Sequence, residues 1–176
     1  RMVPTTSTSL TLLFGDCLSV AVMNKIKFSK EKFKIFHPGG NIGKSLLLAK
    51  DIMITGKKIP IIDIKKTIGQ ALKIINLKKL GIVVVIKKGC IAGLITDGDI
   101  RRTMEKLPKK TTVEKIMTKK PIIISEDTPA AKALAIMNKK KVTCLLVSKD
   151  KDLKKKKSIK LLGIIHIHFL LSHGIR

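Results

Sequence analysis

An internal repeat constrains the fold of this 176-residue chain more than any other feature of its sequence. The tripeptide Asp-Ile-Met at 51–53 recurs as Lys-Ile-Met at 115–117, a period of roughly 65 residues. An apolar run of strand character follows each copy, and a segment with the apolar spacing of a helix follows that run. Self-similarity of this kind indicates two copies of one structural unit.

The elements expected in both copies come in the order strand, helix, strand, strand, helix, so the predicted fold class is α/β. The first helix of each copy has an apolar stripe, which comprises Ile68, Leu72 and Ile75 in one and Ala130, Leu134 and Met137 in the other. The predicted strands are 59–64, 81–86, 90–95, 121–124, 142–147 and 159–165, and the predicted helices are 68–77, 97–105, 130–138 and 169–173.

Two sequence signals mark where the first helix of each copy begins. Thr67 and Gln70 have the spacing of a capping box, with Thr67 as the N-cap. In the second copy Thr128 is the expected N-cap, because Pro129 follows it and proline is favoured at the first helical position. The linker between the copies is expected at 106–112, and a long lysine-rich turn at 149–160.

The N-terminal third of the chain does not repeat. It is expected to hold a Thr/Ser loop, a helix over 10–26, a second helix capped by Ser29, and a turn at 37–40. Gly15 and Asp16 interrupt its longest apolar stretch, so no membrane span is expected. No signal peptide is expected, because the chain opens with Arg1 and a Thr/Ser cluster rather than a basic segment and an apolar core. The start at Arg1 also leads us to expect a fragment of a longer protein. The expected domains are 1–48, 49–108 and 113–176.

The formal net charge of +25 has two interpretations. One is binding to nucleic acid or to an anionic membrane. The other is a lysine-rich composition without such a partner. The basic residues are nearly all lysines spread along the chain, and with 3% aromatics and no Trp or Tyr there are no stacking platforms for single strands. The second interpretation is therefore favoured, and no specific nucleic-acid partner is expected.

The cysteines Cys17, Cys90 and Cys144 are odd in number and widely spaced. This pattern is typical of buried, reduced thiols in a cytoplasm rather than of disulfides. A metal site is not expected either.

The repeated unit resembles a CBS module. The resemblance rests on the Ile-Met edge of each copy and on Gly-Leu-Ile-Thr-Asp-Gly-Asp-Ile-Arg-Arg at 93–102, and it extends from Asp51 to about Ser172. It implies two tandem modules that pack into one disc with clefts for adenine nucleotides.

The whole chain is also similar to the C-terminal part of the D-arabinose 5-phosphate isomerase family. The segments that carry this likeness are 3–8 (Val-Pro-Thr-Thr-Ser-Thr), 13–18, 36–44 (Phe-His-Pro-Gly-Gly-Asn-Ile-Gly-Lys) and 163–168. The resemblance implies that residues 1–48 end a sugar-isomerase domain. It further implies interconversion of D-ribulose 5-phosphate and D-arabinose 5-phosphate for lipopolysaccharide synthesis, by a cytoplasmic homotetramer that needs no cofactor.

Isomerisation of a sugar phosphate requires a base that titrates near neutral pH, and His37 is suited to this role. The family carries a catalytic histidine at the position of His37; the alternative role is to cap a helix end. Thr5, Thr6, Ser7 and Thr8 either bind the sugar phosphate or bond to their own backbone. The family's other catalytic residues lie upstream of this chain, so the fragment alone is expected to be inactive.

The sharpest candidate for a nucleotide site is Thr96 with Asp99. In CBS families a Thr and an Asp three residues later hold the nucleotide, with the carboxylate accepting from ribose hydroxyls. The same pair is also suited to starting a helix, and the two roles are compatible. Thr67 and Lys115 are further candidate contacts, Lys115 for a phosphate.

The second copy departs from this pattern. Aligning Gly163 with Gly93 places His166 at the position of Thr96 and Phe169 at that of Asp99, and phenylalanine cannot accept a hydroxyl. The second copy is therefore expected to be a poor ribose site. An alternative to the isomerase fragment is a free-standing CBS pair that senses an adenine or sugar nucleotide and regulates a partner.

Overall fold

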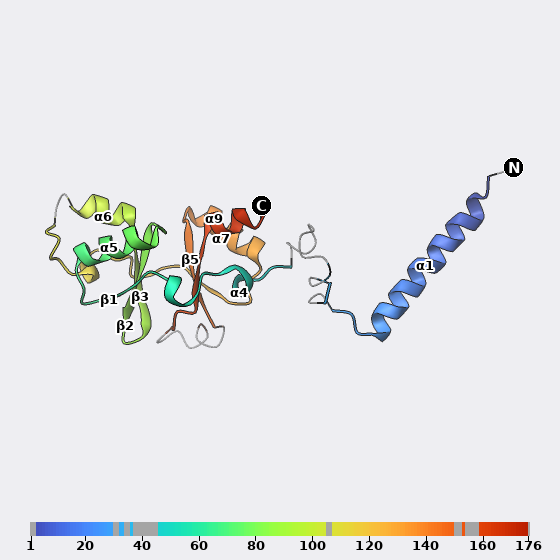
Figure 1. Cartoon of the computed structure of the whole chain (residues 1–176), viewed down its shortest axis with the longest axis horizontal. Coiled ribbons are helices and arrows are strands. Elements are labelled where there is room, and N and C mark those ends of the chain that lie inside the picture. Colours follow the sequence, from blue (N-terminus) through green and yellow to red (C-terminus); the bar gives the residue numbers. More distant parts are fainter. Residues whose placement is uncertain are drawn as a thin grey trace. The chain divides into compact units, whose positions relative to one another are not determined.

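The computed structural model describes residues 3–29, 32–33, 36, 46–104, 107–149, 153 and 159–175. The chain divides into two compact units, Arg1–Leu46 and Leu47–Arg176 (Figure 1). His37 and most of the lysine-rich turn at 149–160 lie outside the described residues.

Helix α1 (Thr5–Lys25) dominates the described part of the first unit. It begins five residues before the predicted helix, so the expected Thr/Ser loop is wrong. The hydroxyls of Ser7 and Thr8 donate to the carbonyl of Pro4, at 3.0 and 2.9 Å. Because hydroxyl side chains can bond to the preceding turn in this way, they are accommodated inside a helix as well as in a loop.

From Leu10 onward large apolar side chains lie on every side of α1, and none of its residues is buried. Gly15 and Asp16, which were expected to interrupt the apolar stretch, lie within the helix, and α1 is long and apolar enough to cross a membrane. The core helix of a globular protein has the same length and composition. The predicted helix was thus too short. Gly15 and Asp16 do not interrupt it, so they give no reason to exclude a membrane span.

The second unit contains two sheets of three strands, ordered β1-β2-β3 and β4-β5-β6. In each sheet the first pair of strands is parallel and the second is antiparallel. The first repeat comprises β1 (Ile61–Asp63), α5 (Ile68–Lys78), β2 (Ile82–Lys87), β3 (Cys90–Thr96) and α6 (Asp97–Met104). The second comprises β4 (Ile123–Ser125), α7 (Ala130–Lys140), β5 (Cys144–Ser148), β6 (Gly163–His166) and α9 (Ile167–Ser172). The predicted α/β class and the repeated order of elements are confirmed.

The two sheets pack face to face, and the helices cover their outer faces (Figure 1). In β2, Ile82 and Val84 belong to the cluster shared with the second sheet, whereas Val83 and Val85 pack under α5 and α6. Alternate residues of a strand point to opposite faces, so each central strand is apolar on both. The resulting order of layers is helices, sheet, sheet, helices.

The predicted start of α5 is confirmed and that of α7 is shifted. Thr67 and Gln70 form the capping box, in which the Gln70 amide donates to Thr67 Oγ1 at 3.4 Å. In the second repeat Pro129, not Thr128, is the N-cap, and it makes no side-chain cap bond. The carbonyl of Thr128 instead accepts from the amide of Ala49 at 2.7 Å.

The hydrogen bond between Ala49 and Thr128 belongs to an exchange of segments between the two repeats. Helix α4 (Ala49–Ile52) precedes the first repeat in the chain, yet its buried residues pack in the core of the second. The backbones of Ile54 and Ile164 exchange two hydrogen bonds, at 2.8 and 3.1 Å. A short 3₁₀ helix, η1 (Gly56–Lys58), then leads into the first sheet.

The reverse exchange occurs after the first repeat. The 3₁₀ helix η2 (Val113–Lys115) packs Val113 into the core under α5, and Leu94 and Thr118 exchange hydrogen bonds of 2.8 and 3.1 Å. Each packed half is thus completed by a segment that precedes the other repeat in the chain.

The cysteines differ in burial, contrary to expectation. Cys17 is exposed, Cys90 is half-buried and Cys144 is buried, and all three are free thiols. The prediction of three buried thiols is therefore wrong for Cys17, which lies on α1.

Candidate functional site

A cavity of about 380 Å³ lies where the two repeats meet. This volume falls within the range of small-molecule sites, which is about 300 to 1,000 Å³. The cavity is lined by residues of β3, of the segment that leads to β4, and of the segment from the end of α7 into β5. These residues are Leu94, Thr96, Thr118, Lys120, Pro121, Ile122, Lys141, Val142, Thr143 and Cys144.

The register of the first sheet places Thr96 at this cavity. Thr96 pairs with Ile82 and Leu94 pairs with Val84 across β3 and β2. Because side chains two apart share a face, Leu94 and Thr96 both point toward the second sheet. Thr96 is also the last residue of β3, so its hydroxyl lies at the edge of the apolar interface.

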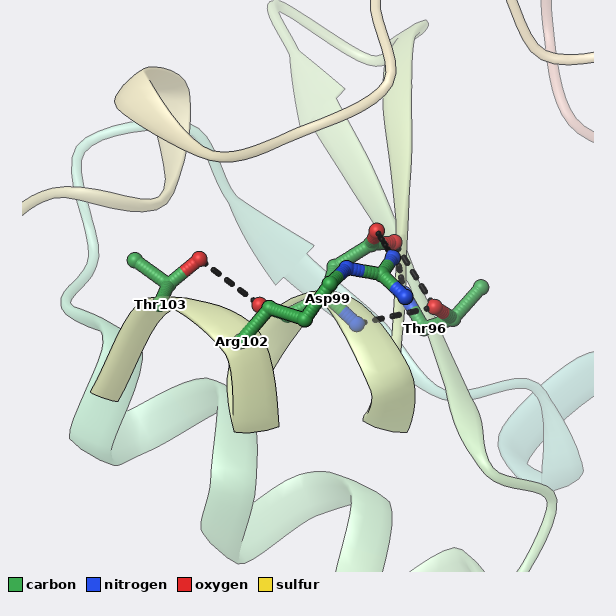
Figure 2. Close-up of polar contacts among 4 residues, drawn as sticks. All are labelled: Thr96, Asp99, Arg102 and Thr103. Atoms are coloured by element: carbon green, nitrogen blue, oxygen red, sulfur yellow. Dashed lines mark hydrogen bonds and ion pairs between the residues drawn. The ribbon is translucent and has the colours of Figure 1, made fainter. Parts of the chain in front are cut away.

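Thr96 and Asp99 form a closed pair at the junction of β3 and α6 (Figure 2). The backbone amide and the hydroxyl of Thr96 both donate to Asp99 Oδ2, at 2.9 and 2.7 Å. The amide of Asp99 is 3.2 Å from Thr96 Oγ1. This reciprocal arrangement satisfies orphan amides at the start of α6, which is the helix-starting role expected from the sequence.

Arg102 holds the other oxygen of the same carboxylate. Its Nη2 atom donates to Asp99 Oδ1 at 2.6 Å, and the Asp99 side chain is 21% exposed (Figure 2). Partial burial acts to raise the pKa of Asp99, but the bonds from Thr96 and Arg102 outweigh it and leave the pKa below its usual value. Each carboxylate oxygen accepts about two hydrogen bonds, so Oδ1 retains capacity for one more donor.

The structure does not bring the other candidate contacts to this cavity. Thr67 is engaged with Gln70 at the start of α5, and its backbone pairs with Thr112. Lys115 is exposed at the end of η2. Of the residues predicted for the nucleotide site, Thr96 lines the cavity and Asp99 bonds to Thr96.

The sequence did not point to four polar residues that line the cavity: Thr118, Lys120, Lys141 and Thr143. Each lies shortly before a strand of the second sheet, opposite Thr96 of the first. The repeat offered a signal for these residues. A residue just before a buried strand lies at an edge of its sheet, and this edge is where the neighbouring sheet ends. Lys141 also adopts the left-handed conformation, with φ 53° and ψ 44°, at the end of α7.

The second repeat has no carboxylate at the position of Asp99. His166 pairs with Cys144 just as Thr96 pairs with Ile82, which supports the alignment made from the sequence. His166 Nδ1 lies 3.4 Å from the amide of His168, and the side chain of Phe169 is 39% exposed. Burial, and then the charge of His168, lower the pKa of His166. Among the described residues no group of three or more His, Cys, Asp or Glu side chains is placed to hold a metal.

The likeness to characterised sequences extends over nearly the whole chain. Arabinose 5-phosphate isomerase KdsD from Yersinia pestis is 36% identical over 178 residues, which is 99% of this chain and 52% of that protein. The matching part is the C-terminal half of such isomerases. The chain therefore spans about half the length of the curated relatives that it matches.

Solved structures share the fold of the second unit at lower identity. The CBS domain pair of protein MJ0100, in complex with 5′-methylthioadenosine and S-adenosyl-L-methionine, is 24% identical with a TM-score of 0.63, over 74% of this chain and 99% of that one. CBSX2 in complex with AMP is 19% identical with a TM-score of 0.60, over 72% and 95%.

The residues that match the CBS domain are 49–106 and 113–168, and each stretch begins with the short helix that precedes a repeat and continues through the strands of that repeat. They make up more than half of the chain, and the fold of the second unit agrees with them. The chain therefore belongs to the CBS-domain family and carries two CBS domains in tandem.

Proposed function

We propose that the tandem CBS pair binds a nucleotide in the 380 Å³ cavity and that this pair is the regulatory part of an arabinose 5-phosphate isomerase. The observation that carries the first half is Thr96, which lines a cavity formed by both repeats and bonds to Asp99. A ligand bound there contacts both CBS domains at once, so its binding energy depends on how they are arranged.

The chemistry of the cavity suits a nucleoside. The side chains of Leu94, Pro121, Ile122 and Val142 offer apolar surface for a flat base. Asp99 Oδ1 then accepts from a sugar hydroxyl while Oδ2 stays in the capping pair. Two solved CBS pairs of the same fold hold adenosine compounds, and an adenine nucleotide is accordingly the first ligand to test. A sugar nucleotide is the second.

The proposed isomerase role rests on likeness over the full chain length, at 36% identity. In this proposal the first unit ends a sugar-isomerase domain, and His37 is the proton-transfer base for interconversion of D-ribulose 5-phosphate and D-arabinose 5-phosphate. Thr5, Thr6, Ser7 and Thr8 form the first turns of α1, next to the phosphate of the substrate. The assembly is a homotetramer.

The apolar surface of α1 supports this proposal. A helix that is apolar all round is expected to be enclosed on every side. In the described part of the chain nothing covers α1, since none of its residues is buried. The remainder of a sugar-isomerase domain supplies such an enclosure. A free-standing CBS sensor gives no account of this helix.

Two assays test the isomerase role. The purified 176-residue chain is expected to show no isomerase turnover, because it lacks the family's upstream catalytic residues. In the longer isomerase of which it is proposed to form the C-terminal part, His37→Ala is expected to remove nearly all activity. Turnover by the chain alone, or full activity of the His37→Ala enzyme, contradicts the assignment.

Calorimetric titration tests the nucleotide site. AMP is expected to bind the chain, and Asp99→Ala is expected to weaken binding at least tenfold, since a buried polar contact to the sugar is lost. The matched control is Asp97→Ala, because Asp97 lies on the same helix in an exposed pair with Arg101. Equal affinity of the wild-type and Asp99→Ala proteins contradicts the proposed site.

A further inference from the structure

We propose that the outer edge of strand β1 is a docking site for an extended, acidic segment of a partner protein. The segment lies along β1 as a fourth strand of the first sheet, with its carboxylates against lysines of a groove beside that strand. The site goes beyond the proposed function, because the groove shares no lining residue with the cavity between the repeats.

The first support is the direction of the backbone groups of β1, which is the outermost strand of its sheet (Figure 1). The carbonyl of Pro60 accepts from the amide of Val84 in β2 at 2.8 Å. In a parallel ladder every second residue of a strand bonds to the neighbouring strand, and the residues between them direct their backbone groups to the other side. Ile61 and Asp63 are therefore the residues whose amides and carbonyls point away from β2.

Three of these four backbone groups face a place where a further strand can lie. The fourth, the carbonyl of Asp63, accepts from the Lys66 amide at 3.0 Å in the turn that leads to α5. The other three are the amides of Ile61 and Asp63 and the carbonyl of Ile61. No strand in the described part of the chain pairs with this side of β1. A row of outward donors and acceptors of this kind is a template for pairing with another chain.

The second support is a groove of about 350 Å³ beside this edge. Ile61 and Ile74 belong to its lining, and the Ile61 side chain is 44% exposed. The residue with the same register in the second repeat, Ile123, is half-buried against the cluster shared by the two sheets. The first repeat thus exposes a large apolar side chain next to an open strand edge, and a segment that covers Ile61 removes it from water.

The third support is the charge of the groove. Lys66 and Lys73 line it with exposed side chains, and neither takes part in a salt bridge within the part of the chain that the structure describes. Asp63 is the one acidic residue in the lining, and its Oδ1 atom already accepts from the Lys65 amide at 2.9 Å. The groove therefore has an excess of positive charge, which is complementary to an acidic partner.

An extended polypeptide matches these three features together. Its backbone supplies both the donor that the Ile61 carbonyl needs and the acceptors that the two amides need, whereas a carboxylate or a phosphodiester supplies acceptors only. Its side chains alternate, so acidic residues at every second position share the face toward the groove. A second copy of this chain is a poor occupant, because its 37 lysines and arginines outnumber its 12 acidic residues and repel the same surface.

The experiment is a nuclear magnetic resonance titration of the full 176-residue chain with the peptide acetyl-Val-Glu-Val-Glu-Val-Glu-amide. The peptide is expected to bind and to slow hydrogen exchange of the Ile61 and Asp63 amides at least tenfold. The amides of Ile123 and Ser125, which hold the same positions in β4, are expected to keep their exchange rates. The same peptide with every amide N-methylated is expected not to bind, because it has no donor for the Ile61 carbonyl.

Substitution of the lysines tests the charge of the groove. Lys66→Gln/Lys73→Gln is expected to weaken binding of the peptide about fivefold, since two contacts between opposite charges are lost. The matched control is Lys139→Gln/Lys140→Gln, which removes the same charge from exposed positions at the end of α7. The control variant is expected to bind the peptide as tightly as the wild-type chain does. Circular dichroism checks that both variants are folded.

Four results overturn this inference. They are no binding of the peptide, undiminished binding of its N-methylated form, slowed exchange at Ile123 and Ser125 in place of Ile61 and Asp63, and equal weakening by the two double variants. The last of these shows that the effect is one of overall charge and not of the groove.

Discussion

Met53, which precedes the first repeat, lies directly against Gly163 of the second. A Cβ atom at Gly163 would come within 2.6 Å of Met53 Sδ and within 2.9 Å of the carbonyl oxygen of Ile54. Met117 has the same relationship to Gly93, with 2.8 Å to its Sδ. The exchanged segments thus approach strands β6 and β3 at positions where only glycine leaves room for them.

Alanine at either glycine is expected to destabilise the protein. Gly163→Ala is expected to lower the free energy of unfolding by about 1 to 3 kcal/mol, the usual cost of overpacking. The Met53 side chain can rotate away, but the Ile54 carbonyl is fixed by its hydrogen bond from the Ile164 amide. Urea denaturation of the full chain measures the change.

Gly69→Ala is the control for this prediction. The nearest atom to a Cβ there is the carbonyl oxygen of Lys109 at 3.5 Å, which is an ordinary contact. Because Gly69 lies inside α5, alanine is expected to leave stability unchanged or to raise it by up to about 1 kcal/mol. Equal stability of the Gly163→Ala and Gly69→Ala proteins contradicts close packing of the exchanged segment.

Asp99 is expected to stabilise the fold at neutral pH and not in acid. Its pKa is lowered in the folded protein, so its contribution is present above the ordinary value of 3.8 and is lost as the pH falls through the lowered value. Asp99→Asn is expected to cost about 1 kcal/mol at pH 7, as for the loss of a helix-capping bond. In urea denaturation the difference between the two proteins should shrink as the pH falls below 3.8 and vanish once it is below the lowered pKa of Asp99, and a pH-independent difference contradicts the ionised pair.

His166 is expected to give a sensitivity of the same sign as Asp99, but at mildly acidic pH. Its folded pKa is lowered from 6.5, so below pH 6.5 the unfolded chain binds the proton more readily and stability falls until the folded pKa is passed. His166→Asn retains a capping acceptor without the titration. The wild-type protein is therefore expected to lose more stability than His166→Asn between pH 7.5 and 5.5. Parallel losses rule out this role for His166.

The three thiols are expected to react at very different rates. Burial raises the pKa of Cys144 to about 12, so almost no thiolate is present at pH 8. Cys17 is exposed on α1. Iodoacetamide followed by peptide mass spectrometry is expected to label Cys17 rapidly and Cys144 only after denaturation. Comparable labelling of both in the native protein would show that Cys144 is accessible.

The repeat and the helices could be predicted because they follow from periodicity. Apolar spacing gave α5 and α7, whose Ile68 and Met137 are each about 1% exposed, and the Thr67–Gln70 signal gave the start of α5. The boundaries of the strands were predicted less accurately, since buried residues such as Ile59 and Ile64 lie just outside β1. A run of apolar residues indicates that the segment is buried, but not which of its residues form hydrogen-bonded pairs with the next strand.

The exchange of segments and the full lining of the cavity could not be predicted. The sequence around Ala49 and Ile52 does not indicate that these residues pack in the core of the second repeat. The Thr96–Asp99 pair could be identified from the resemblance to CBS modules, in which a Thr and an Asp at this spacing hold the nucleotide, and the two side chains do bond to each other. In so lysine-rich a chain neither Lys120 nor Lys141 stands out, and only the structure places them in the lining of the cavity between the repeats.

The most direct test of the proposed site is a crystal structure of the chain grown with AMP. The expected result is one AMP molecule in the cavity between Thr96 and Thr143, with a ribose hydroxyl in hydrogen-bonding distance of Asp99 Oδ1. AMP bound instead beside His166 and Phe169, or a cavity that stays empty at saturating AMP, contradicts the assignment.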